Sequence, residues 1–212
     1  MIGDLLLPVF GWWLFLTALG WAAFPIVSRL LSVLPDRGLA FSRPVGLLLA
    51  GYAFWIAVSA GLLPNSRAGA WIVVLALVGV SAWLARADRE RLRAFLHGRR
   101  RLVIGYEVLF AVALAAWAVY RAYSPNIEPA GGEKFMEMAF INSTLTSPRF
   151  PPTDPWLSGS AISYSYFGSV QAALLVHLSA LAPSVAFNLV IPGTFAMTCL
   201  GAFGLGADMV GL

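Results

Sequence analysis

The sequence predicts an all-α integral membrane protein with about six transmembrane helices, and three observations lead to this class. Apolar residues make up 59% of the chain and charged residues only 11%, with a mean hydropathy of +0.79. A soluble domain carries about 25% charged residues, so lipid must solvate much of this chain. The apolar residues gather in runs of about 20, the length that crosses a bilayer core. The one long polar stretch, residues 121–163, holds four of the ten acidic residues.

Six spans are expected along the chain, with ends uncertain by a few residues. The N-terminal run has no basic flank and is too long for the apolar part of a signal peptide, so it is interpreted as the first span. Inside the later spans, Glu107 is expected to reach the cytoplasmic edge near Arg101, His177 to bond to a neighbouring helix, and Asp208 to lie at the outer end. The expected spans are residues 5–27, 44–63, 68–85, 102–120, 164–181 and 184–209.

Arginine sets the expected orientation. Ten of the fourteen basic residues lie in two short segments, 29–43 and 86–101. Such segments stay in the cytoplasm, which places the N-terminus and the 121–163 loop outside a plasma membrane. The 86–101 cluster lacks the interleaved aromatic residues of a single-stranded nucleic-acid binder. Its predicted partner is therefore anionic lipid, not nucleic acid.

The 121–163 loop contains a predicted interfacial helix at about residues 133–145. Glu133 and Glu137 are four residues apart and share a face, while apolar residues cover most of the remaining circumference. Such a helix is expected to lie on the outer boundary of the membrane with its carboxylates pointing away from it. The proline-rich segment that follows should hold Asp154 in a rigid turn. Carboxylates placed here can bind a cation, act as a general base, or simply be solvated.

A longer motif runs through this loop and into the next span. It combines a Glu-Lys pair, a Met and an acid, an Asn, then Pro-Pro-x-Asp-Pro-Trp and a tyrosine cluster before Phe-Gly. The residues concerned are Glu133, Lys134, Met136, Glu137, Asn142, Pro151, Pro152, Asp154, Pro155, Trp156, Tyr164, Tyr166, Phe167 and Gly168.

This motif resembles the signature of the YYY membrane protein family, large polytopic proteins usually described as a domain of unknown function. That family is similar in architecture to type C glycosyltransferases, which use polyprenyl-phosphate-linked sugars. The chain departs from the pattern at Glu137, where aspartate is usual, and at Ser165, which replaces the middle tyrosine. Family members are longer, so we expect this chain to correspond to an N-terminal part.

The resemblance implies transfer of a sugar from a polyprenyl-phosphate donor on the outer face of the membrane. Glu137 or Glu133 would be the base, and Asp154 would orient the base or hold a divalent cation, with Glu137 as a second possible ligand. Substrate-binding candidates are Arg121 and Lys134 for the phosphate, Tyr164 and Tyr166 for the sugar or prenyl chain, and the motif residues Asn142 and Trp156.

The resemblance also implies two units: an N-terminal three-helix module, 1–101, and the start of a glycosyltransferase-like domain, 102–212. Two other functions stay open, a polytopic transporter and a non-catalytic membrane scaffold. A transporter predicts charged or broken helices near mid-membrane, whereas a scaffold predicts that the loop carboxylates can be neutralised without effect.

Overall fold

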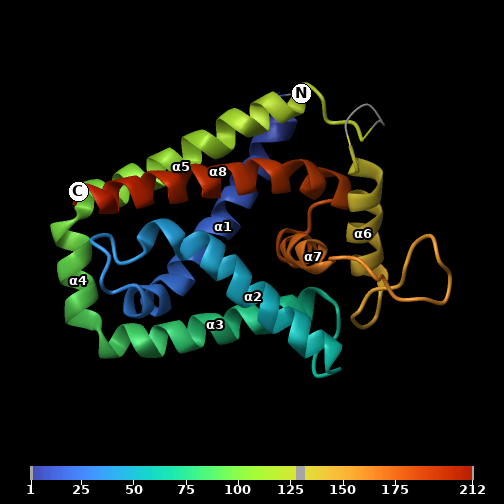
Figure 1. The fold of residues 1–212 in the computed structure, drawn as a ribbon, viewed down its shortest axis with the longest axis horizontal. Coiled ribbons are helices and arrows are strands. Elements are labelled where there is room, and N and C mark those ends of the chain that lie inside the picture. The colour runs from blue at the N-terminus through green and yellow to red at the C-terminus, as the bar shows by residue number, and fades with distance from the viewer. Residues whose placement is uncertain (1, 128–131, 212) are drawn as a thin grey trace.

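The computed structural model describes residues 2–127 and 132–211, so Glu128 of the 121–163 loop lies outside the described residues. The helices are arranged as in Figure 1. They are α1 (Ile2–Leu30), a short 3-10 turn η1 (Leu39–Phe41), α2 (Ser42–Ser59), α3 (Arg67–Ala87), α4 (Arg89–Gly98), α5 (Arg100–Ala122), α6 (Lys134–Thr146), α7 (Phe167–Ser179) and α8 (Pro183–Met209).

The predicted fold class is confirmed. Within the described residues, five helices are long and apolar enough to cross a membrane: α1, α2 together with η1, α3, α5 and α8. They correspond to the expected spans one, two, three, four and six. They pack around one core whose largest fully buried apolar side chains include Trp12, Phe54, Phe110, Leu174 and Leu200.

The expected fifth span is replaced by a shorter helix. The 13 residues of α7 extend only about 20 Å at 1.5 Å per residue, less than the roughly 30 Å of a hydrocarbon core. The helix stops at Ala180, whose φ of 56° is left-handed, and α8 begins three residues later. Consequently α8 starts beside α6 and runs back to the end of the bundle where α4 lies (Figure 1).

This arrangement corrects the position of Asp208. It was expected at the outer end of the last span, but one of its carboxylate oxygens accepts a hydrogen bond from the backbone N–H of Asp36, at 3.0 Å. Asp36 belongs to the arginine-containing loop after α1. Because α7 does not cross the bundle, α8 ends on the opposite side from the one expected.

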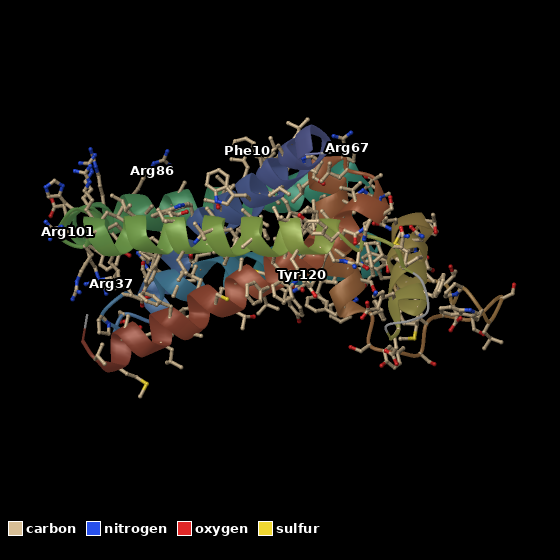
Figure 2. All side chains as sticks on the ribbon, turned by 90° about the horizontal axis from the view of Figure 1, so that it is seen from above. Phe10, Arg37, Arg67, Arg86, Arg101 and Tyr120 are labelled. Carbon is tan, nitrogen blue, oxygen red and sulfur yellow. The ribbon has the colours of Figure 1, made fainter. Side chains whose placement is uncertain are left out.

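The two arginine-rich segments lie together at one end of the bundle, here called the arginine end. Arg29 of α1 pairs with Asp88, between α3 and α4, and the Arg37 guanidinium lies 5.8 Å from the centre of the Phe95 ring on α4. In Figure 2, the labelled residues Arg37, Arg86 and Arg101 lie in the same half of the molecule. At the opposite, acidic end, α6 lies across the bundle (Figure 1).

Arg43 is an exception, and it corrects the expectation for Glu107. Arg43 lies in the first turn of α2 with its side chain only 2% exposed, and its guanidinium pairs with Glu107 of α5. The guanidinium also stacks 4.2 Å from the ring centre of Phe110. Glu107 therefore does not reach toward Arg101 at the edge, because its partner is a buried cation on a facing helix.

Small residues allow α1 and α2 to pack closely, as is common in membrane bundles. A Cβ atom added at Gly46 would overlap the backbone of Leu19, and one added at Gly20 would lie 2.6 Å from Cγ of Arg43. This close contact brings Thr17 of α1 within 3.4 Å of the Arg43 guanidinium.

Candidate functional site

The helix predicted in the acidic loop forms close to its expected bounds, as α6. Gly132, with a φ of +84°, precedes it, and Pro148 follows Ser147 in extended backbone just beyond its end. The N–H of Glu137 donates to the carbonyl of Glu133 at 2.9 Å, so both acids lie in the first turn. Carboxylates are favoured there by the helix dipole.

The face of α6 that packs on the bundle is the face that carries the two acids, and this corrects the expectation that they point away. Phe140, Ile141 and Thr144 are buried. They fall on the same stripe as Glu133 and Glu137 because residues three, four and seven apart are neighbours on a helix. The outward face instead carries apolar side chains such as Phe135, which is 52% exposed.

Glu133 and Glu137 consequently border a cavity of about 430 Å³ between α6, α7 and α8. Both acids are exposed, while the opposite wall is apolar. The lining is completed by Met136, Phe140, Ile141, Tyr164, Ser165, Gly168, Ser169, Ala172, Phe187, Val190 and Ile191. We call this the acidic cavity. One carboxylate edge facing an apolar wall suits an amphiphilic ligand.

Aromatic residues of the motif surround the same helix. The ring of Phe140 lies 5.9 Å from Tyr164 and 5.8 Å from Trp156, and both of these are largely exposed. Tyr166 points elsewhere: its hydroxyl accepts a hydrogen bond from the Trp55 indole of α2, at 3.0 Å. Tyr164 thus joins the acidic cavity to a second hollow of about 340 Å³ beside Tyr166 and Trp55.

Asp154 lies outside the acidic cavity and holds a turn. Its Oδ1 accepts hydrogen bonds from the backbone N–H groups of Trp156 and Leu157, at 2.8 and 3.0 Å. Its own N–H donates to the carbonyl of Ser160 at 2.8 Å. The rigid turn expected from the prolines is present. Among the described residues no three His, Cys, Asp or Glu side chains gather as a metal site.

The other predicted binding residues are also outside the lining of the acidic cavity. Arg121 lies in the last turn of α5, where it donates to the carbonyl of Ser124. Its Nε and Nη2 atoms are buried and have no hydrogen-bond partner among the described residues. Lys134 begins α6, and Asn142 is exposed on that helix. The structure therefore brings together Glu133, Glu137 and Tyr164 from the predicted set.

Sequence reasoning missed Asn65, which fixes the far end of α6. Its amide nitrogen donates to the carbonyls of Thr144 and Ser147, at 2.6 and 2.7 Å. Its amide oxygen faces Nε2 of His177 at 3.1 Å, so that nitrogen must carry the proton. His177 thus bonds to the α2–α3 loop instead of a neighbouring helix. The sequence of Pro64–Ser66 predicts only a turn before a helix. It contains no signal that Asn65 bonds to α6 and to His177.

In the part of the chain that the structure describes, five apolar helices of spanning length define a multi-pass membrane protein in contact with lipid. Within this class, a model of the uncharacterized membrane protein family DUF2298 matches residues 49–212 of the 212, and the chain belongs to that family. The matched region includes every residue that lines the acidic cavity. No curated protein and no solved structure matches the chain.

Proposed function

We propose that the acidic cavity is the site of a glycosyltransferase-like reaction, in which a sugar leaves a polyprenyl-phosphate donor at the outer face of a plasma membrane. The observation that carries this proposal is the pairing of Glu133 and Glu137 with an apolar wall in one cavity. A volume of about 430 Å³ lies within the usual range of ligand pockets, roughly 300–1,000 Å³. The resemblance of the motif to the YYY family supports the same reaction class.

The proposed orientation follows from charge. With the arginine end in the cytoplasm, as the positive-inside rule requires, α6 and the acidic cavity face outward. The N-terminus then lies outside, and the C-terminal end of α8 lies inside. A donor anchored by its prenyl chain in the outer leaflet would reach the cavity along the apolar residues of α7 and α8.

In the proposed mechanism, Glu137 accepts the proton of the acceptor hydroxyl as that oxygen attacks the anomeric carbon of the donor. The bond from this carbon to the phosphate oxygen breaks, and the phosphate leaves with the electron pair. A general base needs hydrogen-bond reach to the proton it removes, and Glu137 borders open cavity space. Tyr164 would stack on the sugar, while Lys134 and Arg121 would attract the phosphate from outside the cavity.

Of the acids predicted to hold a divalent cation or act with it, only Glu133 and Glu137 border the acidic cavity. Mg²⁺ is commonly held by one or two carboxylates together with substrate phosphate and water, and Glu133 and Glu137 could supply that pair. When bound, the ion would neutralise charge on the leaving phosphate. Asp154 would not join them, since it lies outside the lining of the acidic cavity. Its proposed role is to hold the loop beside α6.

We also propose that the two expected units have separate roles. Residues 102–212 carry the acidic cavity, and residues 1–101 support it from the side. Two contacts are consistent with the supporting role of residues 1–101: the bonds from Asn65 to the end of α6, and the bond from Trp55 to Tyr166.

The test compares wild type with Glu137→Gln, Glu133→Gln and the double variant. Each is measured for lipids that co-purify with it, by mass spectrometry, and for release of sugar from a polyprenyl-phosphate donor. Loss of a general base should slow release about 10²- to 10⁴-fold while the helical signal in circular dichroism stays unchanged. Glu90→Gln, on α4 at the other end, is the matched control and should release sugar normally. Full activity in both single variants and the double would refute the proposal and favour a scaffold.

Transport is the second candidate, and the Arg43–Glu107 pair favours it because buried charge within membrane helices often marks an ion path. The chain would then move protons or small ions when reconstituted in liposomes. A flux above protein-free liposomes that disappears in Glu107→Gln would support transport. A flux unchanged in that variant would exclude this pair from the path.

A further inference from the structure

We propose that the arginine end carries a binding site for one anionic phospholipid, in a cavity at the corner between α4 and α5. The cavity has a volume of about 800 Å³, and Phe203 of the adjacent helix α8 contributes to its wall. It lies at the opposite end from the acidic cavity and is independent of the function proposed there. Its lining is cationic at the corner, with Arg99, Arg100 and Arg101, and becomes apolar along α5.

The mouth of this cavity is cationic. Arg99, Arg100 and Arg101 follow one another at the start of α5, and none of them forms an ion pair within the described residues. Of the three, Arg99 also attracts the carboxylate of Asp208. No side chain caps the N-terminus of α5, so its first N–H groups add positive potential at the same place.

The charge of the whole arginine end favours an anion. Counted over the described residues and without the buried Arg43–Glu107 pair, this end has nine arginines and four carboxylates. Three of the four acids are already engaged: Asp88 pairs with Arg29, Asp36 accepts bonds from the N–H groups of Gly38 and Ala40, and Asp208 accepts one from the N–H of Asp36. The potential is therefore positive around the mouth.

The inner wall of the cavity is apolar and runs along α5. Leu102, Gly105 and Leu109 are spaced at three and four residues on one face of that helix. Tyr106 packs edge-on against Phe203 of α8, with ring centres 6.1 Å apart, and Phe203 is 53% exposed. An acyl chain parallel to α5 would cover this wall, while free phosphate would leave it bare. The combination thus selects a lipid with an anionic headgroup, as basic pockets between membrane helices do.

The test is native mass spectrometry of the full chain in detergent with added phosphatidylglycerol or phosphatidylcholine. Wild type should retain one phosphatidylglycerol in preference to phosphatidylcholine. Arg100→Gln/Arg101→Gln should weaken retention about 25-fold, at roughly fivefold for each arginine. Arg91→Gln/Arg93→Gln is the matched control, since these arginines are exposed on α4 and lie outside the lining.

An uncharged substitution distinguishes lipid binding in the cavity from general electrostatic attraction of anionic lipid to the arginine end. Gly105 lines the cavity, and a Cβ at this position would have no neighbour within 4 Å. Gly105→Leu therefore places an apolar side chain in the cavity without a change in charge. It should reduce phosphatidylglycerol retention as strongly as the Arg100/Arg101 variant. Equal losses in both arginine pairs, or full retention in Gly105→Leu, would overturn the proposal. Displacement of the lipid by equimolar inorganic phosphate would also overturn it, in favour of a free-anion site.

Discussion

The buried pair between Arg43 and Glu107 offers the sharpest test of how this bundle is held together. Arg43 is 2% exposed and Glu107 26% exposed, so the two single changes should not be equivalent. Glu107→Leu leaves the guanidinium buried without its partner and should lower the free energy of unfolding by about 3–5 kcal/mol. Arg43→Met leaves a carboxylate that retains some exposure. Its cost should be about 2–3 kcal/mol, including the lost stacking on Phe110.

The double variant Arg43→Met/Glu107→Leu removes both charges and should recover most of the loss, because apolar side chains can replace a buried ion pair at little cost. We expect a coupling free energy of at least about 2 kcal/mol between the two positions. The assay is reversible unfolding in mixed micelles by SDS, followed by circular dichroism. A double variant whose loss equals the sum of the single losses would refute the reasoning, since the side chains would then act independently.

Three further predictions concern other contacts. Asn65→Ala should lower the stability of the end of α6 by about 1–3 kcal/mol because two buried carbonyls lose their donor. Faster hydrogen exchange over residues 140–147 would show this loss of stability. Unchanged exchange would contradict the prediction. Gly46→Ala should destabilise the contact of α2 with α1 by about 1–3 kcal/mol, whereas Gly79→Ala, with open space around its Cβ, should leave SDS unfolding unchanged. The hydrogen bond from Arg29 lowers the pKa of Asp88 below its ordinary 3.8, so its stabilisation is present above pH 3.8 and is lost as pH falls through the lowered value. Asp88→Asn should abolish that acid-dependent part in an SDS titration repeated from pH 5 down to pH 2, and an unaltered pH profile would count against it.

The sequence predicted the spans that face lipid because their signal is local. Runs of about 20 apolar residues predicted α1, α2, α3, α5 and α8 within a few residues. The same kind of apolar run wrongly predicted a membrane span at α7. Residues 170–178 are almost all buried, so this helix is apolar because it lies in the core of the bundle. Hydropathy alone does not distinguish a core helix from a span, and only length and the left-handed Ala180 reveal the difference.

The direction of the α6 carboxylates was predicted wrongly for a related reason. Apolar side chains surround most of this helix, so its sequence does not indicate which face packs on the bundle. The spacing of Glu133 and Glu137 was enough to predict a shared face. That this face, with Phe140, Ile141 and Thr144, is the one that packs on the bundle depends on contacts with α7 and α8, which local periodicity does not contain.

The sequence by itself determined the membrane class, the ends of the long helices, the gathering of arginine at one end and the acidic helix at the other. Composition and local periodicity carry all of these. Only the tertiary structure decided that Arg43 pairs with Glu107, 64 residues away, and that His177 meets Asn65, 112 residues away. It also decided that Glu133 and Glu137 border a cavity. Lipid tails and helix interiors are similarly apolar, so a hydrophobic run shows that a helix is buried in a membrane but not which neighbour each face will contact.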